Sequence, residues 1–291
     1  MAELLLQTGF NALYAASYLA LVSVGLVLIF GVMGVINFAH GEIYMLGAYA
    51  VVFAYADHGM PFLLAVGLAV LLTGLVGLGM ERALFRPLRD NPLGGLIASI
   101  GLLLMLQALV VTFFGIRMES VPVPFPGTVN LFGVEGVVVP WQRVLVILAA
   151  VLLLGGLWLF LKRSRLGWAL RACAQDPEAA ALQGISRVQT ARVAIVIGAS
   201  LAGVAGALTA PLVRTFPYMG HSVIVAAFIV IIAGGMGSLE GAVIAAVLYA
   251  FVTTFVTTFV DGVAADIVGL LLMLLVLVVR PQGLFGKADR A

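Results

Sequence analysis

Long stretches without a charged side chain constrain this 291-residue chain more than any other feature. No Asp, Glu, Lys, Arg or His occurs in residues 93–116, 193–213 or 241–260. At a rise of 1.5 Å per residue, about twenty helical residues cross the roughly 30 Å hydrocarbon core of a membrane. Only 10% of the residues are charged, against roughly 25% in a soluble domain. We therefore expect an all-α fold, a polytopic transmembrane helical bundle.

The apolar runs predict eight or nine crossing segments within one domain that covers residues 1–291. Two of them, 36–56 and 222–241, are interrupted by polar residues and glycines, so either can be a broken or re-entrant helix. The stretch 117–140 is rich in Pro, Val and Gly and is expected to form an external loop. The segments are 9–31, 36–56, 61–80, 93–115, 142–161, 192–213, 222–238, 241–260 and 263–279.

The basic residues predict the orientation of the bundle. They gather in three groups, which hold twelve of the 15 basic residues: Arg82, Arg86 and Arg89; Lys162, Arg163, Arg165, Arg171, Arg187 and Arg192; and Arg280, Lys287 and Arg290. Nine crossings place all three groups on one side, which the positive-inside rule identifies as the cytoplasm. The N-terminus is then outside and the C-terminus cytoplasmic, in a bacterial inner membrane. No basic residue precedes the first apolar run, which is too long for a signal-peptide core, so no cleavable signal is expected.

Several classes of protein are excluded by what the sequence lacks. The single cysteine, Cys173, rules out an intrachain disulfide and a Cys-based metal site. No phosphate-binding G-x-x-x-x-G-K-[ST] loop, no H-E-x-x-H and no G-x-S-x-G occurs, so neither an ATPase nor a membrane-embedded hydrolase is indicated. The net charge of +2 reflects loop topology rather than nucleic-acid binding.

The polar segment 162–192 predicts a short helix outside the membrane. Asp176 can cap a helix whose first residue is Pro177, where a missing N–H costs nothing. Glu178 lies in the first turn, where the helix dipole favours a negative charge, and Gly184 ends the helix. Between them lie strong helix formers: Ala179, Ala180, Ala181, Leu182 and Gln183. An ordinary interfacial helix would have the same composition.

Six segments in order along the chain resemble one family. They are GVINFAHGEIYMLGAYA (34–50), ERALFRPLR (81–89), LIASIGLLLMLQ (96–107), RLGWALRACAQDPEAAALQGIS (165–186), AFIVIIAGGMGSLEGAVIAA (227–246) and RPQGLFG (280–286). Together they are similar to the branched-chain amino acid permeases of ABC importers, of the LivH type. Permeases for urea and short amides share much of this pattern.

The resemblance implies a division of labour. Such a permease pairs with a second, homologous permease, with two cytoplasmic ATP-binding subunits and with a periplasmic substrate-binding protein that delivers an amino acid. ATP is then bound by the partner subunits, and this chain carries no cofactor. Glu178, Ala179 and Ala180, followed by Gly184, resemble the EAA loop that docks on the ATP-binding subunit, although the Leu-Pro of the fuller motif is missing. The ATPase-coupling residues are then Asp176, Pro177, Glu178, Ala179, Ala180 and Gly184.

Two polar interruptions are candidates for the substrate pathway. Asn37, His40 and Glu42 would cost several kcal/mol in lipid, so they must face protein or water. His40 and Glu42 lie about 200° apart on an ideal helix, so a break near Gly41 is expected. These residues can line the path or lock a gate, or they can form hydrogen bonds between helices.

The second interruption comprises Gly234, Gly235, Gly237, Ser238, Glu240 and Gly241. Half-helix ends here could bind a zwitterion, but close packing explains glycines equally well. Gln107 is expected to bond between helices, and the face formed by Thr253, Thr254, Thr257 and Thr258 is interpreted as packing, with bonds to its own helix. A secondary transporter, for which Glu42 and Glu240 are the candidate acids, and a passive channel remain alternatives.

Overall fold

The computed structural model describes residues 1–130 and 137–286, so Glu135 of the external loop and Lys287 and Arg290 of the tail lie outside the described residues. Its helices are α1 (Ala2–Met33), α2 (His40–Val51), α3 (Phe62–Met80), α4 (Pro92–Phe114), α5 (Trp141–Arg163), α6 (Arg165–Gln175), α7 (Pro177–Leu182), α8 (Arg187–Thr209), α9 (Met219–Gly234), α10 (Leu239–Phe259) and α11 (Gly262–Val279). Short π-helical segments, Val52–Asp57 and Glu81–Phe85, extend α2 and α3. The prediction of a polytopic helical bundle is confirmed.

The two segments that the sequence marks as interrupted are the short ones. Within the described residues, seven helices are long and apolar enough to span a membrane: α1, α3 with its π-helical extension, α4, α5, α8, α10 and α11. The apolar helix α9 has 16 residues, and α2 has 12 before its π-helical extension. Sixteen residues reach only about 24 Å, so α9 ends short of a full crossing.

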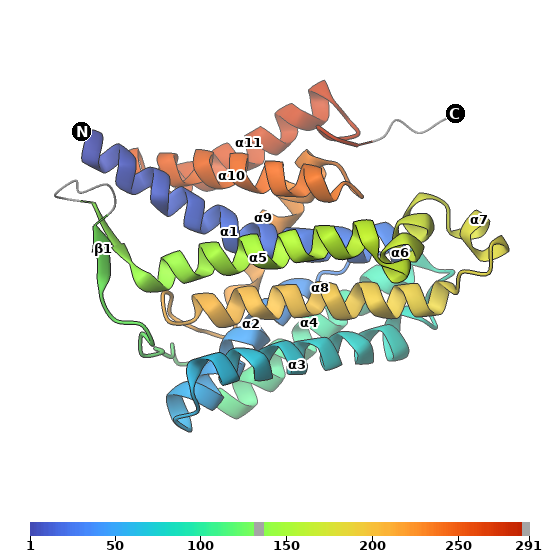
Figure 1. Cartoon of the computed structure of the whole chain (residues 1–291), viewed down its shortest axis with the longest axis horizontal. Coiled ribbons are helices and arrows are strands. Elements are labelled where there is room, and N and C mark those ends of the chain that lie inside the picture. Colours follow the sequence, from blue (N-terminus) through green and yellow to red (C-terminus); the bar gives the residue numbers. More distant parts are fainter. Residues whose placement is uncertain (131–136, 287–291) are drawn as a thin grey trace.

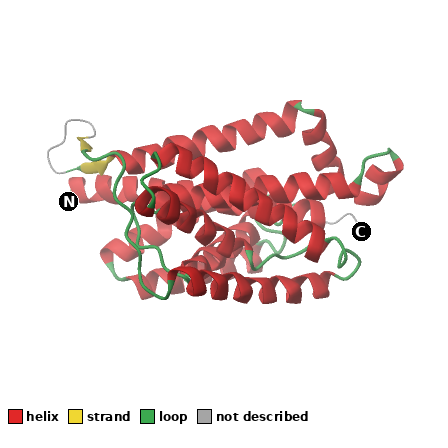
Figure 2. Cartoon of the chain, turned by 90° about the horizontal axis from the view of Figure 1, so that it is seen from below, coloured by secondary structure: helices red, strands yellow, loops and turns green. Residues whose placement is uncertain are grey.

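The bundle has two distinct ends (Figure 1). One end carries the start of α1 and a short antiparallel hairpin, in which β1 (Thr128–Asn130) pairs with β2 (Val138–Pro140). We call it the hairpin end. The opposite end carries α6, α7 and the last turn of α11, and we call it the α7 end. In Figure 2 the long helices run between these ends, and the connecting loops gather at them. Part of the expected external loop is therefore ordered as a hairpin, and Glu119 pairs with Thr215 in an isolated bridge.

Helices α1 and α8 form the centre of the bundle. In each of them, 72% of the most apolar window is buried within the chain, against 17% for α4 and α11. Small residues allow α8 to approach its neighbours closely. A Cβ added at Gly206 of α8 would lie 1.9 Å from the backbone oxygen of Tyr44 in α2. A Cβ at Gly25 of α1 would lie 2.6 Å from the oxygen of Gly198 in α8. These contacts need glycine.

The break between α1 and α2 precedes the position that the sequence suggests. Gly34 ends α1 with a φ of 67°, a left-handed conformation that favours glycine. Helix α2 then begins at His40, so Gly41 lies inside its first turn. Gly41 is required for another reason, because a Cβ there would lie 2.3 Å from the oxygen of Gly220 in α9. The expected break near Gly41 is therefore wrong by several residues.

Candidate functional site

Helix α7 begins with the cap that the sequence predicts. The Asp176 carboxylate oxygen Oδ1 accepts hydrogen bonds from the backbone N–H groups of Glu178 and Ala179, both at 2.9 Å. Pro177 occupies the first helical position, where it leaves no backbone donor unpaired. An aspartate cap of this kind stabilises a helix by about 1 kcal/mol, which matters for a helix of six residues.

The other end of α7 is a Schellman turn, formed when a residue after the helix adopts a left-handed conformation. Gly184 has a φ of 78°. Its N–H donates to the oxygen of Ala181 at 2.9 Å, and the N–H of Ile185 donates to the oxygen of Ala180 at 3.1 Å. This is the pattern in which glycine is strongly preferred. The short helix is thus fixed at both ends by its own residues.

Helix α7 presents small side chains and one large apolar side chain to its surroundings. Ala180 is buried against the rest of the chain, whereas Glu178, Ala179 and Ala181 are exposed. Leu182 is 88% exposed, the largest fraction among the large apolar side chains of the described residues. The helix projects from the end of the bundle (Figure 1).

Helix α6 connects α7 to the centre of the bundle. It contacts α5, α1 and α8 as well as α7. Ser164 caps it by accepting from the N–H of Gly167 at 2.8 Å. The Thr190 hydroxyl of α8 donates to the buried sulfur of Cys173 in α6 at 3.3 Å. Helix α6 therefore links α7 to both α8 and α1.

A buried carboxylate, which the sequence analysis did not single out, lies at the α7 end of the bundle. Glu81 is fully buried where α3 passes into its π-helical extension. Its Oε2 accepts from Nε of Arg192 in α8 at 3.3 Å, and its Oε1 lies 4.0 Å from Nη2 of Arg89. Arg192 and Arg89 come from two of the three basic groups used to predict orientation. Arg192 therefore also joins the extension of α3 to α8, and Arg89 lies near the same carboxylate from the loop before α4.

The first group of pathway candidates makes hydrogen bonds inside the bundle. His40 donates from Nε2 to the oxygen of Val22 in α1 at 3.1 Å. Glu42 accepts at Oε1 from Nε2 of Gln107 in α4 at 2.9 Å, which confirms the expected interhelical bond of Gln107. Asn37, His40 and Glu42 are all fully buried. His40 and Glu42 thus bond between helices, whereas Asn37 accepts at Oδ1 from the backbone N–H of Ala39, within its own loop, at 3.1 Å.

The second group of candidates forms a tight turn between α9 and α10. Gly235 and Gly237 have φ values of 106° and 107°. The C-terminal segment covers this turn, because the N–H of Leu284 donates to the oxygen of Ala233 at 2.8 Å and the N–H of Phe285 to that of Gly234 at 3.0 Å. Ser238 caps α10 and Glu240 is exposed in its first turn. The cluster is a helix-connecting turn beside the chain terminus.

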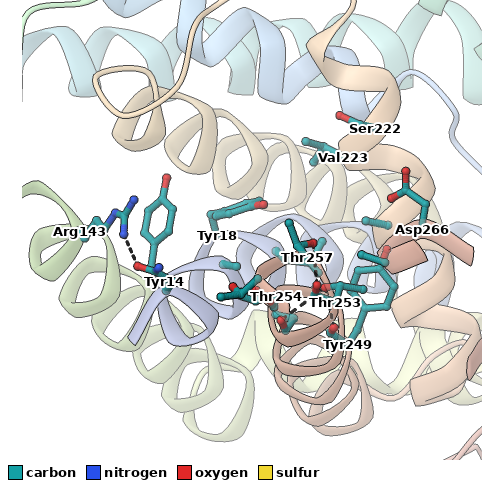
Figure 3. A pocket seen from close by; sticks show the side chains of 17 residues that line it. Tyr14, Tyr18, Arg143, Ser222, Val223, Tyr249, Thr253, Thr254, Thr257 and Asp266 are labelled. Carbon is teal, nitrogen blue, oxygen red and sulfur yellow. Dashed lines mark hydrogen bonds between the residues drawn. The ribbon is translucent and has the colours of Figure 1, made fainter. Parts of the chain in front are cut away.

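A cavity of about 460 Å³ lies in the half of the bundle nearer the hairpin end, where α1 and α5 begin. Figure 3 shows it from close by. Side chains from α1, α5, α9, α10 and α11 line it. Its wall includes three tyrosines, Tyr14, Tyr18 and Tyr249, and four threonines, Thr253, Thr254, Thr257 and Thr258. None of the eight pathway candidates, Asn37, His40, Glu42, Gly234, Gly235, Gly237, Ser238 and Glu240, is among the residues that line this cavity. A cavity of this size can hold a small molecule.

The threonine face is more than packing. Thr253 donates to the oxygen of Tyr249 at 2.8 Å and Thr257 to that of Thr253 at 2.8 Å, which are the bonds within one helix that the sequence predicts. The same face lines the cavity, so its interpretation as packing alone is wrong. Because the hydroxyl hydrogens are used within the helix, the oxygens remain available as acceptors.

Two oppositely charged side chains lie at the cavity wall. Arg143, in the first turn of α5, donates from Nη1 to Oδ1 of Asn11, and its guanidinium carbon lies 5.3 Å from the ring centre of Tyr14. Asp266, in α11, lies on the opposite side of the cavity in Figure 3. Neither residue is among the candidates that the sequence singles out. Their position on helix ends that face one cavity was not predicted.

Comparisons with known proteins agree over nearly the whole chain. A family model described as the permease component of branched-chain amino acid transport systems matches residues 9–279. The high-affinity branched-chain amino acid transport permease BraD of Pseudomonas aeruginosa is 34% identical, over 98% of this chain and 96% of that protein. LivH of Escherichia coli K12, which carries the same description, is 33% identical over the same shares of the two chains.

One solved structure is similar in fold. PsaBC from Streptococcus pneumoniae, solved in complex with a Fab, matches with a TM-score of 0.52. The match covers 94% of this chain and 92% of that one, at 14% sequence identity. At this identity the likeness concerns the fold alone.

Proposed function

Because this chain belongs to the family of permease components of branched-chain amino acid transport systems, we propose that it carries a branched-chain amino acid across the membrane in an assembly driven by ATP. The chain is the transmembrane permease component of an ABC transport system and is not itself catalytic. The observation that carries the proposal is a match of one third identity to permeases of that description, over nearly the full length of both chains.

The partners in our proposal are those of an ABC importer: two cytoplasmic ATP-binding subunits, a second homologous permease and a periplasmic substrate-binding protein. We assign docking of an ATP-binding subunit to α7. Three features support this: the helix is fixed at both ends, it exposes Ala179, Ala181 and Leu182, and it contacts the bundle through α6. ATP is bound by the partner subunits.

The α7 end of the bundle is cytoplasmic in this proposal, and the hairpin end faces outward. The three basic groups support this orientation, since their described members belong to the connections between α3 and α4, between α5 and α8, and after α11. The start of α1 is then outside. The cavity then lies in the outer half of the bundle, on the side from which a binding protein would deliver its amino acid. The buried bonds of His40 to α1 and of Glu42 to α4 support a role in holding the helices together beside the pathway, and Asn37 bonds within the loop that precedes α2.

The test is reconstitution with and without the other subunits. The chain, its candidate permease partner and the ATP-binding subunits are co-expressed, purified through a tag on this chain, and placed in vesicles with the binding protein outside. We expect the ATP-binding subunits to copurify and labelled leucine to accumulate only when ATP is supplied. A catalytically inactive ATP-binding subunit is the control.

The alternatives give different results in the same vesicles. Accumulation of leucine by this chain alone, without ATP, would identify a secondary transporter and overturn the proposal. Equilibration without accumulation would identify a passive channel. Unlabelled urea and acetamide, added as competitors, test the amide-permease alternative, because our proposal expects neither to reduce leucine uptake.

A further inference from the structure

The cavity near the hairpin end combines one positive and one negative side chain with uncharged polar groups. Among the described residues that line it, Arg143 and Asp266 are the charged ones. Neither forms an ion pair with another described residue. Both lie near the start of a helix, Arg143 in α5 and Asp266 in α11. A pair of opposite charges across a cavity matches a ligand that itself carries one charge of each sign.

We propose that this cavity binds the transported amino acid as a zwitterion, with its carboxylate at Arg143 and its ammonium group on the side of Asp266. The inference rests on the proposed function, because it takes a free amino acid as the substrate. It adds a binding site within the permease itself.

Arg143 is held in place before any ligand arrives. Asn11 accepts a hydrogen bond from Nη1, and the Tyr14 ring lies beneath the guanidinium at 5.3 Å. Arginine has five N–H donors in a planar fork that matches a carboxylate. One of them is used by Asn11, so donors remain for a ligand. Neither Asn11 nor Tyr14 neutralises the positive charge, which stays available to an anion.

The opposite wall suits an ammonium group. Figure 3 shows Asp266 across the cavity from Arg143, with Tyr18 and Thr257 between them. Hydroxyl oxygens and aromatic faces both attract ammonium groups. The two charges produce a field that orients a zwitterion, so direct contact with both side chains at once is not needed.

The rest of the lining suits an aliphatic side chain. Leu19, Val223 and Ala226 contribute apolar surface from α1 and α9. A cavity of about 460 Å³ lies within the range of small-molecule sites. Opposite charges therefore select the common part of every amino acid, while the apolar surface favours a hydrophobic side chain.

The experiment measures binding of labelled leucine to the purified permease–ATPase assembly in nanodiscs, without the binding protein. Two analogues of leucine separate its charges: 4-methylpentanoate keeps the carboxylate alone, and 3-methylbutylamine keeps the ammonium alone. The variants are Arg143→Gln and Asp266→Asn. The matched controls are Arg117→Gln and Asp57→Asn, which alter exposed residues outside the cavity.

The expected result is a crossed pattern. Arg143→Gln should lower the affinity for leucine and for 4-methylpentanoate on the order of ten-fold, which is the effect of losing one hydrogen bond to a charged group. The affinity for 3-methylbutylamine should not change. Asp266→Asn should lower the affinity for leucine and for 3-methylbutylamine, and the affinity for 4-methylpentanoate should not change. Arg143→Lys should restore part of the carboxylate binding.

Other outcomes overturn the inference. If Arg143→Gln lowers the affinity for 3-methylbutylamine as much as the affinity for leucine, the role of Arg143 is structural. If both variants match their controls, or if the unaltered assembly binds no leucine, the cavity is not the site. Asp266 is exposed, so Asp266→Asn decides the question even if Arg143→Gln fails to fold. ATP-driven uptake by the unaltered assembly, measured alongside, shows whether the inference or the proposed function has failed.

Discussion

Leu182 offers the sharpest test of how α7 would dock on an ATP-binding subunit. Its side chain is 88% exposed, so nearly all of its apolar surface is available to a partner. Complete burial of a leucine side chain contributes about 1.5–3 kcal/mol. Alanine keeps only the first carbon, so Leu182→Ala should remove about 1–2 kcal/mol of association free energy, roughly a 5- to 30-fold rise in the dissociation constant.

The same substitution should leave the fold intact. An exposed side chain contributes little to the free energy of unfolding, usually within about 0.5 kcal/mol, and alanine favours helix at least as well as leucine. The Asp176 cap and the Gly184 turn are unchanged. The matched control is Leu152→Ala, because Leu152 is 74% exposed in the middle of α5 and away from α7.

The measurement is the affinity of the purified ATP-binding subunit for the permease in nanodiscs, by biolayer interferometry, together with thermal unfolding of each variant. Weaker binding by Leu182→Ala alone, with the three unfolding midpoints equal, supports docking through α7. Equal dissociation constants for Leu182→Ala, Leu152→Ala and the unaltered chain would refute the reasoning, since an apolar contact of this size cannot be lost without effect.

Three further predictions concern contacts within the bundle, each measured by thermal unfolding in detergent. Gly206→Ala forces a Cβ to 1.9 Å from a backbone oxygen of α2 and should lower the free energy of unfolding by about 1–3 kcal/mol. The control Gly101→Ala, where an added Cβ meets nothing within 4 Å, should leave stability unchanged or raise it. Equal unfolding midpoints for the two variants would contradict the close approach. Glu81→Gln should lower the midpoint because it removes the charge from the bond to Arg192, worth about 1.5–3 kcal/mol, and no change would mean that water replaces the pair. Gln107→Leu leaves the buried carboxylate of Glu42 in α2 without its hydrogen-bond donor and should lower the free energy of unfolding by about 1–3 kcal/mol. An unchanged midpoint would show that this bond contributes nothing to stability.

Local features of this protein could be read from the sequence because neighbouring residues determine them. The cap at Asp176, the proline after it and the turn at Gly184 are set within nine positions. The helices follow from apolar runs, whose length is dictated by the thickness of the membrane. The end of α1 also carries a local signal, because Gly34 readily adopts the left-handed conformation that ends this helix. This glycine alone would have placed the break correctly.

The cavity could not be predicted, because it depends on which faces of distant helices meet. Tyr14 of α1, Arg143 of α5 and Asp266 of α11 are more than a hundred residues apart from one to the next, and each is unremarkable in its own segment. The threonine face of α10 looks the same in sequence whether it meets a helix or a cavity. The glycine turn at Gly235 depends on Leu284 and its neighbours returning to cover it, which no local pattern reveals.

The arrangement of the bundle limits how a movement at α7 could alter the cavity. Helix α1 is continuous over 32 residues; it carries Asn11, Tyr14 and Tyr18 on the cavity wall, and Gly31 near its other end lies beside Ala174 of α6. A continuous helix without proline or an inserted π-turn resists bending. A displacement of α6 would therefore reach the cavity as a rigid shift or rotation of α1 relative to α10 and α11, which carry the threonine face and Asp266. Such a shift would move Asn11 and Tyr14, which hold Arg143 of α5, relative to Asp266 of α11. A zwitterion held between the two charges would lose affinity in the same movement.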